Sequence, residues 1–266
     1  MELKILCIGD VVGNPGRRVL EEALDKLVSE RGIGFVVVNA ENAAGGSGLT
    51  ETIYEKILGC GVDVITMGDH IYKRREIIQI LETSDHIVRP ANMPSGAPGK
   101  EVVIRESASN HRVAVISVLG RMYMKTPFDC PFRAVDRVLA SLPQDVKLIV
   151  VDVHAEATSE KIAMGWHLDG RVTALVGTHT HVPTADERVL PKGTAYITDL
   201  GMTGPYDSVL GRDRKRVVSA MVSGVPNRFD VATDDPRMCG LLITCDTTTG
   251  RASAVERVRF NGTAES

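Results

Sequence analysis

The sequence predicts an α/β protein with a largely parallel sheet, and three observations lead to this fold class. Apolar runs alternate with amphipathic segments through the first half of the chain, as in consecutive βαβ units. From residue 101 the pattern changes to two apolar runs around a short polar stretch, which is typical of a hairpin that begins a second sheet. Several apolar runs also end in residues that can bind metal ions, and such ends meet at one edge of an open α/β sheet.

The first half of the chain has the pattern of three strands, each followed by a helix. The expected strands and helices cover 3–9, 15–30, 34–38, 49–58, 62–67 and 72–82 in that order. The helix at 15–30 begins with a proline and has Gly32 just past its end, and both are ordinary boundary signals.

The second half begins with the hairpin and then alternates again. Its expected elements are strands at 102–105 and 113–118, a helix at 132–142, a strand at 147–153, a helix at 159–167, a strand at 172–176, a helix at 214–222 and a terminal hairpin with strands at 239–245 and 252–260. No internal repeat or low-complexity linker divides the chain. We therefore expect one domain over 1–260 and a flexible tail over 261–266.

The composition is that of an ordinary globular protein. Of the 266 residues, 43% are hydrophobic and 24% are charged, which is enough apolar material for a sizeable core. The formal net charge of -3 implies no basic surface, so long nucleic acids are not expected as partners, whereas a small phosphorylated ligand remains open.

The five cysteines form no Cys-x-x-Cys pair, and we expect them to be reduced residues that serve in packing. No signal peptide or membrane-length apolar run is evident, so we expect a cytoplasmic protein without a membrane partner.

The most informative spacing is that of His179 and His181, which directly follow an apolar run and Gly177-Thr178. Residues at i and i+2 of a strand point to the same side, so both imidazoles could reach one metal centre. Four other apolar runs also end in potential ligands. The pooled candidates are Asp10, Glu41, Asn42, Asp69, His70, His154, His179 and His181.

This set is larger than one tetrahedral zinc ion requires. A mixture of carboxylate, amide and imidazole groups without cysteine fits two octahedral or five-coordinate ions, such as manganese or iron, better than a structural zinc. Two such ions about 3.5 to 4 Å apart are the usual apparatus for hydrolysing phosphate esters. The sequence therefore predicts a two-metal phosphoesterase.

Several of these motifs also have a purely structural interpretation. Asp10, which follows a glycine, is as typical of a helix N-cap as of a metal ligand. The glycines at 43–48 do not form a phosphate-binding loop with Gly-Lys-Ser/Thr, and Ser47 lacks the sequence of a nucleophile elbow. We expect the cluster from Arg212 to Arg216, which Asp213 interrupts, to solvate the start of a helix rather than to bind phosphate.

Longer blocks of sequence resemble one known family. These blocks are Ile8 to Arg17, Val38 to Gly46, Arg89 to Asn92, His154 to Lys161, Gly177 to His181, Thr184 to Arg188 and Thr198 to Val209. On these residues the chain resembles bacterial calcineurin-like metallophosphoesterases that act as 2',3'-cyclic-nucleotide 2'-phosphodiesterases, and the likeness covers nearly the whole chain in order. It implies the calcineurin-like fold, a mixed β-sandwich flanked by helices on both faces, and a homo-oligomer whose size it does not fix.

The resemblance also implies a role for each candidate at the first ion. Asp10 and His181 would hold this ion, Asn42 would sit beside it, and Glu41 would bridge it to the second ion. Both ions would be iron or manganese, in preference to zinc or magnesium.

At the second ion the sequence departs from the family. The resemblance implies that position 69 holds this ion with His154 and His179, and that His70 faces the substrate as the general acid. The usual Gly-Asn-His of the family is Gly68-Asp69-His70 here, so an amide ligand has become a carboxylate. We expect the extra negative charge to tighten cation binding and to weaken attraction for an anionic phosphate.

The implied reaction is hydrolysis of 2',3'-cyclic nucleotides to 3'-nucleotides by attack of a metal-activated hydroxide on phosphorus. The expected partner is accordingly a small phosphate-ester substrate. Two alternatives remain open. One is a phosphomonoesterase or a broader phosphodiesterase that uses the same centre, and the other is a metal-binding regulatory or scaffold protein in which Asp69 has reduced turnover.

Overall fold

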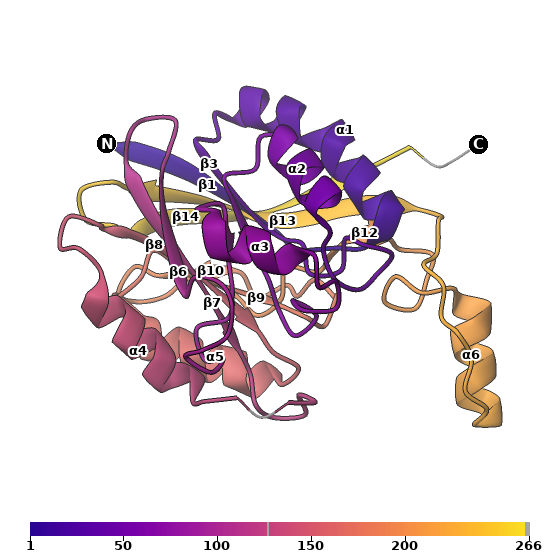
Figure 1. The fold of residues 1–266 in the computed structure, drawn as a ribbon. Helices are drawn as coiled ribbons and strands as arrows, with labels where there is room; N and C mark the ends of the chain where they lie inside the picture. Colours follow the sequence, from indigo (N-terminus) through magenta and orange to yellow (C-terminus); the bar gives the residue numbers. More distant parts are fainter. Residues whose placement is uncertain (127, 264–266) are drawn as a thin grey trace.

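Two mixed β-sheets pack face to face, and helices cover the outer face of each sheet (Figure 1). This computed structural model describes residues 1–126 and 128–263. The arrangement is the β-sandwich flanked by helices that the sequence predicted, and the expectation of a calcineurin-like fold is confirmed at this level. The last three residues of the tail expected over 261–266 lie outside the described residues, and the division into one domain and a tail stays a prediction.

The first sheet has the strand order β2-β12-β13-β1-β3-β4-β5, with β14 paired to β13. Its strands are β1 (Glu2–Ile8), β2 (Asp10–Val11), β3 (Phe35–Asn39), β4 (Val64–Thr66), β5 (Ile87–Val88), β12 (Met202–Pro205), β13 (Pro236–Asp246) and β14 (Ala252–Asn261). The strands β1, β3, β4 and β5 are parallel neighbours, whereas β13 runs antiparallel to β1. All five residues of β3 are buried, as expected for a parallel strand covered on both faces.

The second sheet has the order β10-β11-β9-β8-β7-β6. Its strands are β6 (Val102–Glu106), β7 (Arg112–Leu119), β8 (Leu148–His154), β9 (Ala174–Thr178), β10 (Arg188–Val189) and β11 (Ala195–Ile197). The antiparallel pair β6 and β7 is the hairpin expected at the start of a second sheet. From β7 through β8 and β9 to β11 the strands are parallel, so their carboxyl ends share one edge.

The helices form the two outer layers. They are α1 (Gly13–Arg31), α2 (Glu51–Gly59) and α3 (Ile77–Thr83) on the first sheet, and α4 (Pro131–Ser141) and α5 (Thr158–Leu168) on the second. A further helix, α6 (Arg214–Ser223), projects away from the layers and has Val217 as its buried residue (Figure 1).

Alternation along the central strands divides the apolar side chains between layers. In β1, Ile5 and Cys7 pack between the two sheets, whereas Leu6 and Ile8 pack against the helices of the first sheet. Each fully buried aliphatic side chain of this kind contributes roughly 1.5 to 3 kcal/mol through removal from water. All five cysteines are free thiols, and Cys7, Cys239 and Cys245 are buried as packing residues.

The predicted elements are present, with two kinds of error. The helix expected at 72–82 begins only at Ile77, because the preceding residues form turns that start from Gly68 and His70. The short strands β2, β5, β10, β11 and β12 were not predicted, since two to four residues carry too little periodicity. Among the described residues, no helix is both long enough and apolar enough to cross a bilayer.

Candidate metal centre

The carboxyl ends of strands from both sheets meet, and the candidate ligands predicted from the sequence lie where they meet. Asp10, Glu41 and Asp69 follow β1, β3 and β4 of the first sheet, while His154 ends β8 and His179 follows β9 of the second. The remaining candidates, each in contact with one of these, are Asn42, His70 and His181. The structure therefore brings all eight predicted residues into one connected cluster.

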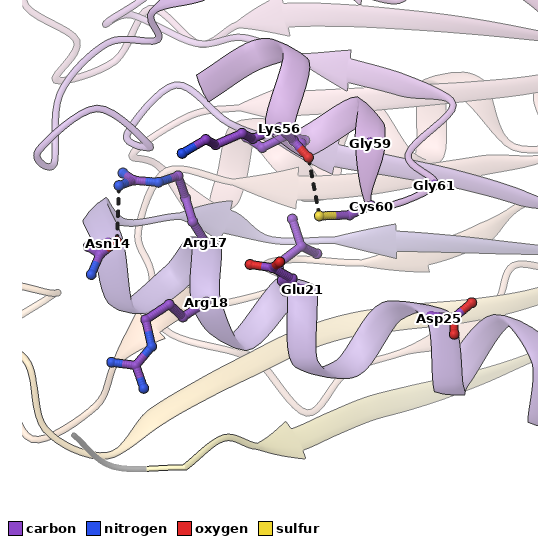
Figure 2. A pocket seen from close by; sticks show the side chains of 11 residues that line it. Asn14, Arg17, Arg18, Glu21, Asp25, Lys56, Gly59, Cys60 and Gly61 are labelled. Carbon is purple, nitrogen blue, oxygen red and sulfur yellow. Dashed lines mark hydrogen bonds between the residues drawn. The ribbon is translucent and has the colours of Figure 1, made fainter. Parts of the chain in front are cut away.

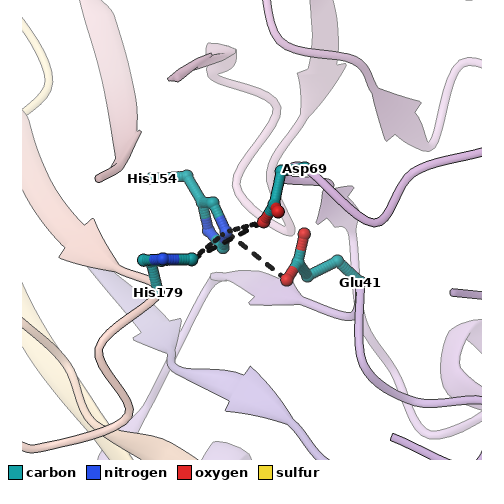
Figure 3. A group of neighbouring side chains, drawn as sticks. All are labelled: Glu41, Asp69, His154 and His179. Atoms are coloured by element: carbon teal, nitrogen blue, oxygen red, sulfur yellow. Dashed lines mark hydrogen bonds and ion pairs between the residues drawn. The ribbon is translucent and has the colours of Figure 1, made fainter. Parts of the chain in front are cut away.

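Four of these residues form a compact group of potential ligands (Figure 3). One ligand atom from each of Glu41, Asp69, His154 and His179 lies within 4.8 Å of the others. The His154 Nε2 atom lies 3.2 Å from Asp69 Oδ1 and 3.4 Å from Glu41 Oε1. The His179 Nδ1 atom lies 3.0 Å from the same nitrogen. Two imidazoles and two carboxylates thus face one small volume, as a metal ion requires.

A second group of candidate ligands also contacts Glu41. The His181 Nε2 atom is 3.7 Å from Asp10 Oδ1, and the Asn42 amide nitrogen lies 3.2 Å from His181 Nε2 and 3.0 Å from Glu41 Oε1. The N-cap of α1 is Val12, with no side-chain cap, so Asp10 is not a helix cap and that structural interpretation is wrong. Glu41 is therefore placed to connect both groups.

The environment of Asp10 fits a cation. Its side chain is fully buried, and Oδ1 has no hydrogen-bond partner among the described residues. A buried carboxylate oxygen in this state costs free energy unless a positive charge stands beside it. Burial raises the pKa of Asp10 to about 6, although His181 and His154 oppose the shift.

The charges around His154 also fit a site for a cation. Burial alone would lower its pKa, but Glu41, Asp69 and Asp10 hold the pKa of this imidazole well above its usual value. Burial, followed by His154, instead lowers the pKa of His179 to about 4, so His179 is neutral and can act as a ligand. These carboxylates stabilise a positive charge beside them. Bound metal ions could supply that charge in place of protons.

His70 lies at the edge of the cluster with a partly exposed side chain. Its Nδ1 atom is 2.7 Å from Asn42 Oδ1 and 3.1 Å from Glu41 Oε1, and its backbone N–H donates to Glu41 Oε2 at 2.9 Å. Its Nε2 atom is farther from the neighbouring carboxylate, 3.9 Å from Asp69 Oδ2. Burial by itself lowers the pKa of His70, but the hydrogen bond to Glu41 outweighs it and raises the pKa overall.

The two histidines after β9 converge for a different reason from the one predicted. The strand ends at Thr178, and both His179 and His181 have left-handed backbones, with φ of 92° and 63°. Strand alternation therefore does not place them on one side. His179 turns to His154 and Asp69, whereas His181 turns to Asp10, so the pair serves both halves of the cluster. A positive φ is strained for histidine and must be held by surrounding contacts.

A buried ion pair holds this loop. The Asp199 Oδ2 atom accepts hydrogen bonds from the Thr180 backbone N–H at 3.2 Å and from the Thr180 hydroxyl at 2.6 Å. The same oxygen accepts from Lys161 Nζ at 2.7 Å, and both charged side chains are almost completely buried. The His179 backbone N–H also donates to Asp10 Oδ2 at 3.1 Å. These bonds fix the residue between the two histidines.

A second buried carboxylate, which was not among the predicted candidates, orients His154. Asp152 on β8 accepts hydrogen bonds from Asn39 at 3.1 Å, from Thr178 at 2.7 Å and from Thr66. Because the Thr178 hydroxyl donates to Asp152, it accepts from His154 Nδ1 at 2.8 Å, which leaves Nε2 directed toward the cluster. A charged residue inside the apolar strand at 147–153 was the available sequence signal.

A cavity of about 310 Å³ opens onto the cluster and is also lined by Arg212. Asp213 does cap α6, because its Oδ1 accepts from the Arg216 backbone N–H at 2.9 Å. The expectation that the whole cluster from Arg212 to Arg216 serves the helix start is nevertheless wrong at its first residue. Arg212 instead lines the cavity together with candidate ligands, and its guanidinium donates to the Gly45 and Gly46 carbonyls.

A larger cavity of about 600 Å³ lies between α1 and α2 (Figure 2). Its wall carries charges of both signs, including Arg17, Lys56, Glu21 and Asp25. None of the eight candidate ligands lines it, and its histidine-free wall offers no matching set of donors. We therefore assign the candidate site to the smaller cavity, on its chemistry rather than its size.

Known proteins are similar to this chain over almost its whole length. A family model described as YmdB-like protein matches residues 6–258. A curated relative from Bacillus subtilis (strain 168), named 2',3'-cyclic-nucleotide 2'-phosphodiesterase, is 46% identical over 97% of this chain and 97% of its own length.

Two solved structures are also similar over nearly the whole chain. A hypothetical protein from Thermus thermophilus superposes with a TM-score of 0.91 and 38% identity, covering 97% of this chain and 99% of its own. A protein from Mycoplasma pneumoniae described as a novel phosphatase has a TM-score of 0.91 and 32% identity, covering 98% and 94%. With the family model and these relatives spanning almost all of its length, the chain belongs to the family of YmdB-like proteins.

Proposed function

We propose that this chain is a metal-dependent phosphodiesterase that hydrolyses 2',3'-cyclic nucleotides to 3'-nucleotides. The observation that carries the proposal is the cluster of Glu41, Asp69, His154 and His179 beside a buried Asp10 oxygen without a partner among the described residues. The cavity of about 310 Å³ that opens onto this cluster has the size of a small-molecule site. The name of the Bacillus subtilis relative supports the choice of substrate class.

The donor set divides naturally between two ions. Asp10 and His181, with Asn42 beside them, would hold one ion, and Glu41 would contribute to both. The second ion would be held by Asp69, His154 and His179. We propose iron or manganese, because oxygen and imidazole ligands without thiolates suit these metals. When bound, such ions lower the pKa of water and neutralise charge on phosphoryl oxygens.

His70 is the residue we assign to proton transfer. Its Nδ1 contact with Asn42 Oδ1 fixes the ring, and His70 lines the cavity beside the candidate ligands. A proton held at Nε2 could pass to the departing 2' oxygen when the cyclic ester opens to the 3'-phosphate. General acid catalysis of this kind contributes roughly 10² to 10⁴ in rate.

The network beneath the centre positions the ligands. Thr178 fixes the tautomer of His154, and Asp199 holds Thr180 between the two loop histidines. Ligands held by packed strands and buried hydrogen bonds lose little freedom when an ion or a substrate binds. These contacts support a preorganised site, in keeping with the proposed hydrolysis of a small phosphate ester.

Metal analysis and product analysis on one preparation test the proposal. The protein is purified without chelator, its metals are quantified, and 2',3'-cyclic AMP, a linear diester and a monoester are assayed in parallel. Two iron or manganese ions per chain with 3'-AMP as the product are expected. Preferred turnover of the monoester would favour a phosphomonoesterase, and bound metal without turnover of any ester would favour a regulatory role. A metal-free, inactive protein would contradict the proposal.

A further inference from the structure

The backbone of Arg212 is fixed next to the candidate metal centre. In the tight turn that carries it, the Arg212 backbone N–H donates to the Val209 carbonyl at 3.0 Å and the Val209 N–H donates back at 2.9 Å. The Leu210 carbonyl of the same turn lies 3.2 Å from His181 Nδ1. The turn that carries Arg212 is therefore in contact with a candidate metal ligand.

Among the described residues, backbone oxygens hold the guanidinium group of Arg212. Within residues 1–126 and 128–263 its hydrogen bonds go to the carbonyls of Gly45, Gly46 and Phe229, and no carboxylate oxygen lies within 4.0 Å. A guanidinium has five N–H donors, so these three bonds leave donors for another acceptor. Burial lowers the pKa of Arg212, which Asp230 opposes from a greater distance, and the group keeps its charge.

The neighbouring arginines are different. Arg214 pairs with Asp207, and Arg216 pairs with Asp230 at 2.6 Å, and the side chains of both arginines are exposed. Their charges are compensated on the surface, whereas the charge of Arg212 has no such partner among the described residues at the wall of the cavity. An anionic group of the ligand would stabilise a positive charge that has no partner among the described residues at this wall.

Gly46 makes room for this arginine. Its φ of +83° is a conformation that residues with a side chain rarely adopt, and a Cβ atom built there would lie 2.5 Å from Arg212 Nη1. The loop that begins at Glu41 therefore packs closely against the turn before α6, and the Arg212 guanidinium lies at this contact. Residues of both segments line the cavity, Glu41, Asn42 and Gly46 from the loop and Leu210 and Arg212 from the turn.

We propose that Arg212 binds the anionic phosphoryl group of the substrate and sets the preference of the cavity for phosphate esters. The proposal rests on the proposed function and adds the residue that recognises the substrate charge. The planar fork of arginine matches two phosphoryl oxygens at once. Three carboxylates leave two divalent ions with a net charge of only one positive unit, and Arg212 would add a second.

Three substitutions of Arg212 and one control test this role. Arg212→Met removes charge and donors, Arg212→Lys keeps the charge, and Arg212→Gln keeps donors without charge, while Arg214→Met removes a surface charge of the same type. For Arg212→Met we expect the KM for 2',3'-cyclic AMP to rise roughly 10- to 100-fold, as does the Kd for inorganic phosphate measured by calorimetry on the metal-loaded protein. We expect Arg212→Lys to retain part of the affinity, Arg212→Gln to lose it, and Arg214→Met to behave as the wild type.

Metal content, measured on each variant, separates the outcomes. Unchanged phosphate affinity in a metal-loaded Arg212→Met protein would overturn the proposal, and so would loss of metal, since Arg212 would then act by supporting His181. Should Arg212→Met fail to fold, equal phosphate affinity in the Lys and Gln variants overturns it instead. A wild type that hydrolyses no cyclic nucleotide but binds phosphate through Arg212 would refute the proposed function while upholding this role.

Discussion

His70 lies at the edge of the candidate metal centre and does not belong to the proposed set of ion ligands. We therefore expect His70→Ala to keep its metal and to lose roughly 10²- to 10⁴-fold in turnover of 2',3'-cyclic AMP, because the leaving oxygen has no proton donor. Metal analysis and kinetics on the same preparation measure both effects. His86→Ala is the matched control, since His86 Nδ1 contacts the Asp63 carbonyl at 2.8 Å and does not line the cavity. Unchanged turnover would remove His70 from the mechanism.

Asp69 adds a negative charge where the resemblance described above implies an amide. Its Oδ1 atom lies 3.2 Å from His154 Nε2 and 3.6 Å from His179 Nδ1, so it belongs to the compact group of ligands. We expect Asp69→Asn to bind metal about fivefold more weakly or worse, since one unit charge at about 4 Å is worth about 1 kcal/mol even in water. Turnover should rise as attraction for phosphate increases. Chelator competition measures the metal affinity, and kinetics measure the turnover. A variant that loses metal without turning over faster contradicts the expected gain in turnover.

At the scale of elements, hydrogen bonds between strands of both sheets orient His154. Thr178 on β9 joins Asp152 and His154 on β8, and Asn39 of β3 adds a bond from the other sheet. We expect Thr178→Val to lower metal affinity roughly 10- to 100-fold, because His154 loses the partner that fixes its tautomer. Thr178→Ser keeps the hydroxyl and should restore affinity. Metal titration of both variants measures the affinity. Full metal affinity in Thr178→Val would show that packing alone orients the His154 ring.

The buried ion pair links α5 to the loop after β9. Lys161→Met removes the cation beside Asp199 and leaves a buried charge unpaired, so we expect a loss of about 3 to 5 kcal/mol in the free energy of unfolding. Lys26→Met is the control, because the Lys26–Glu30 pair is exposed and should contribute less than about 1 kcal/mol. Urea unfolding of both variants measures the difference. Equal losses would contradict a structural role for the buried pair.

At the scale of the whole molecule, bound ions would connect the two sheets. Glu41 follows β3 of the first sheet, whereas His154 ends β8 and His179 follows β9 of the second, so an ion held by all three would cross-link the sandwich. Manganese at about 100 times its Kd should stabilise the fold by about 2.7 kcal/mol. Thermal unfolding with chelator and with added manganese should give clearly different midpoints. His154→Ala should lose this response, and identical midpoints for the wild type would argue against a metal held across the sheets.

The strand pairing of the whole molecule was only partly predictable. The parallel order of β1, β3 and β4 follows from the alternation of strands and helices. The pairing of β1 with β13 joins the two ends of the chain, and no local pattern specifies it. The strands β2 and β12 depend on pairing with distant residues, since Met202 lies opposite Asp10 and Gly204 lies opposite Arg237 of β13. Such short strands are consequences of tertiary contacts.

The sequence by itself determined the order of the main elements and the set of candidate ligands, because apolar periodicity and residue chemistry are local properties. Only the tertiary structure decided how the ligands divide. His179 and His181 face different partners because contacts with distant residues hold a positive φ at both. Arg212 reaches the cavity because its turn folds onto a loop more than 160 residues earlier. Contacts over such separations depend on packing of the whole chain, which no local pattern encodes.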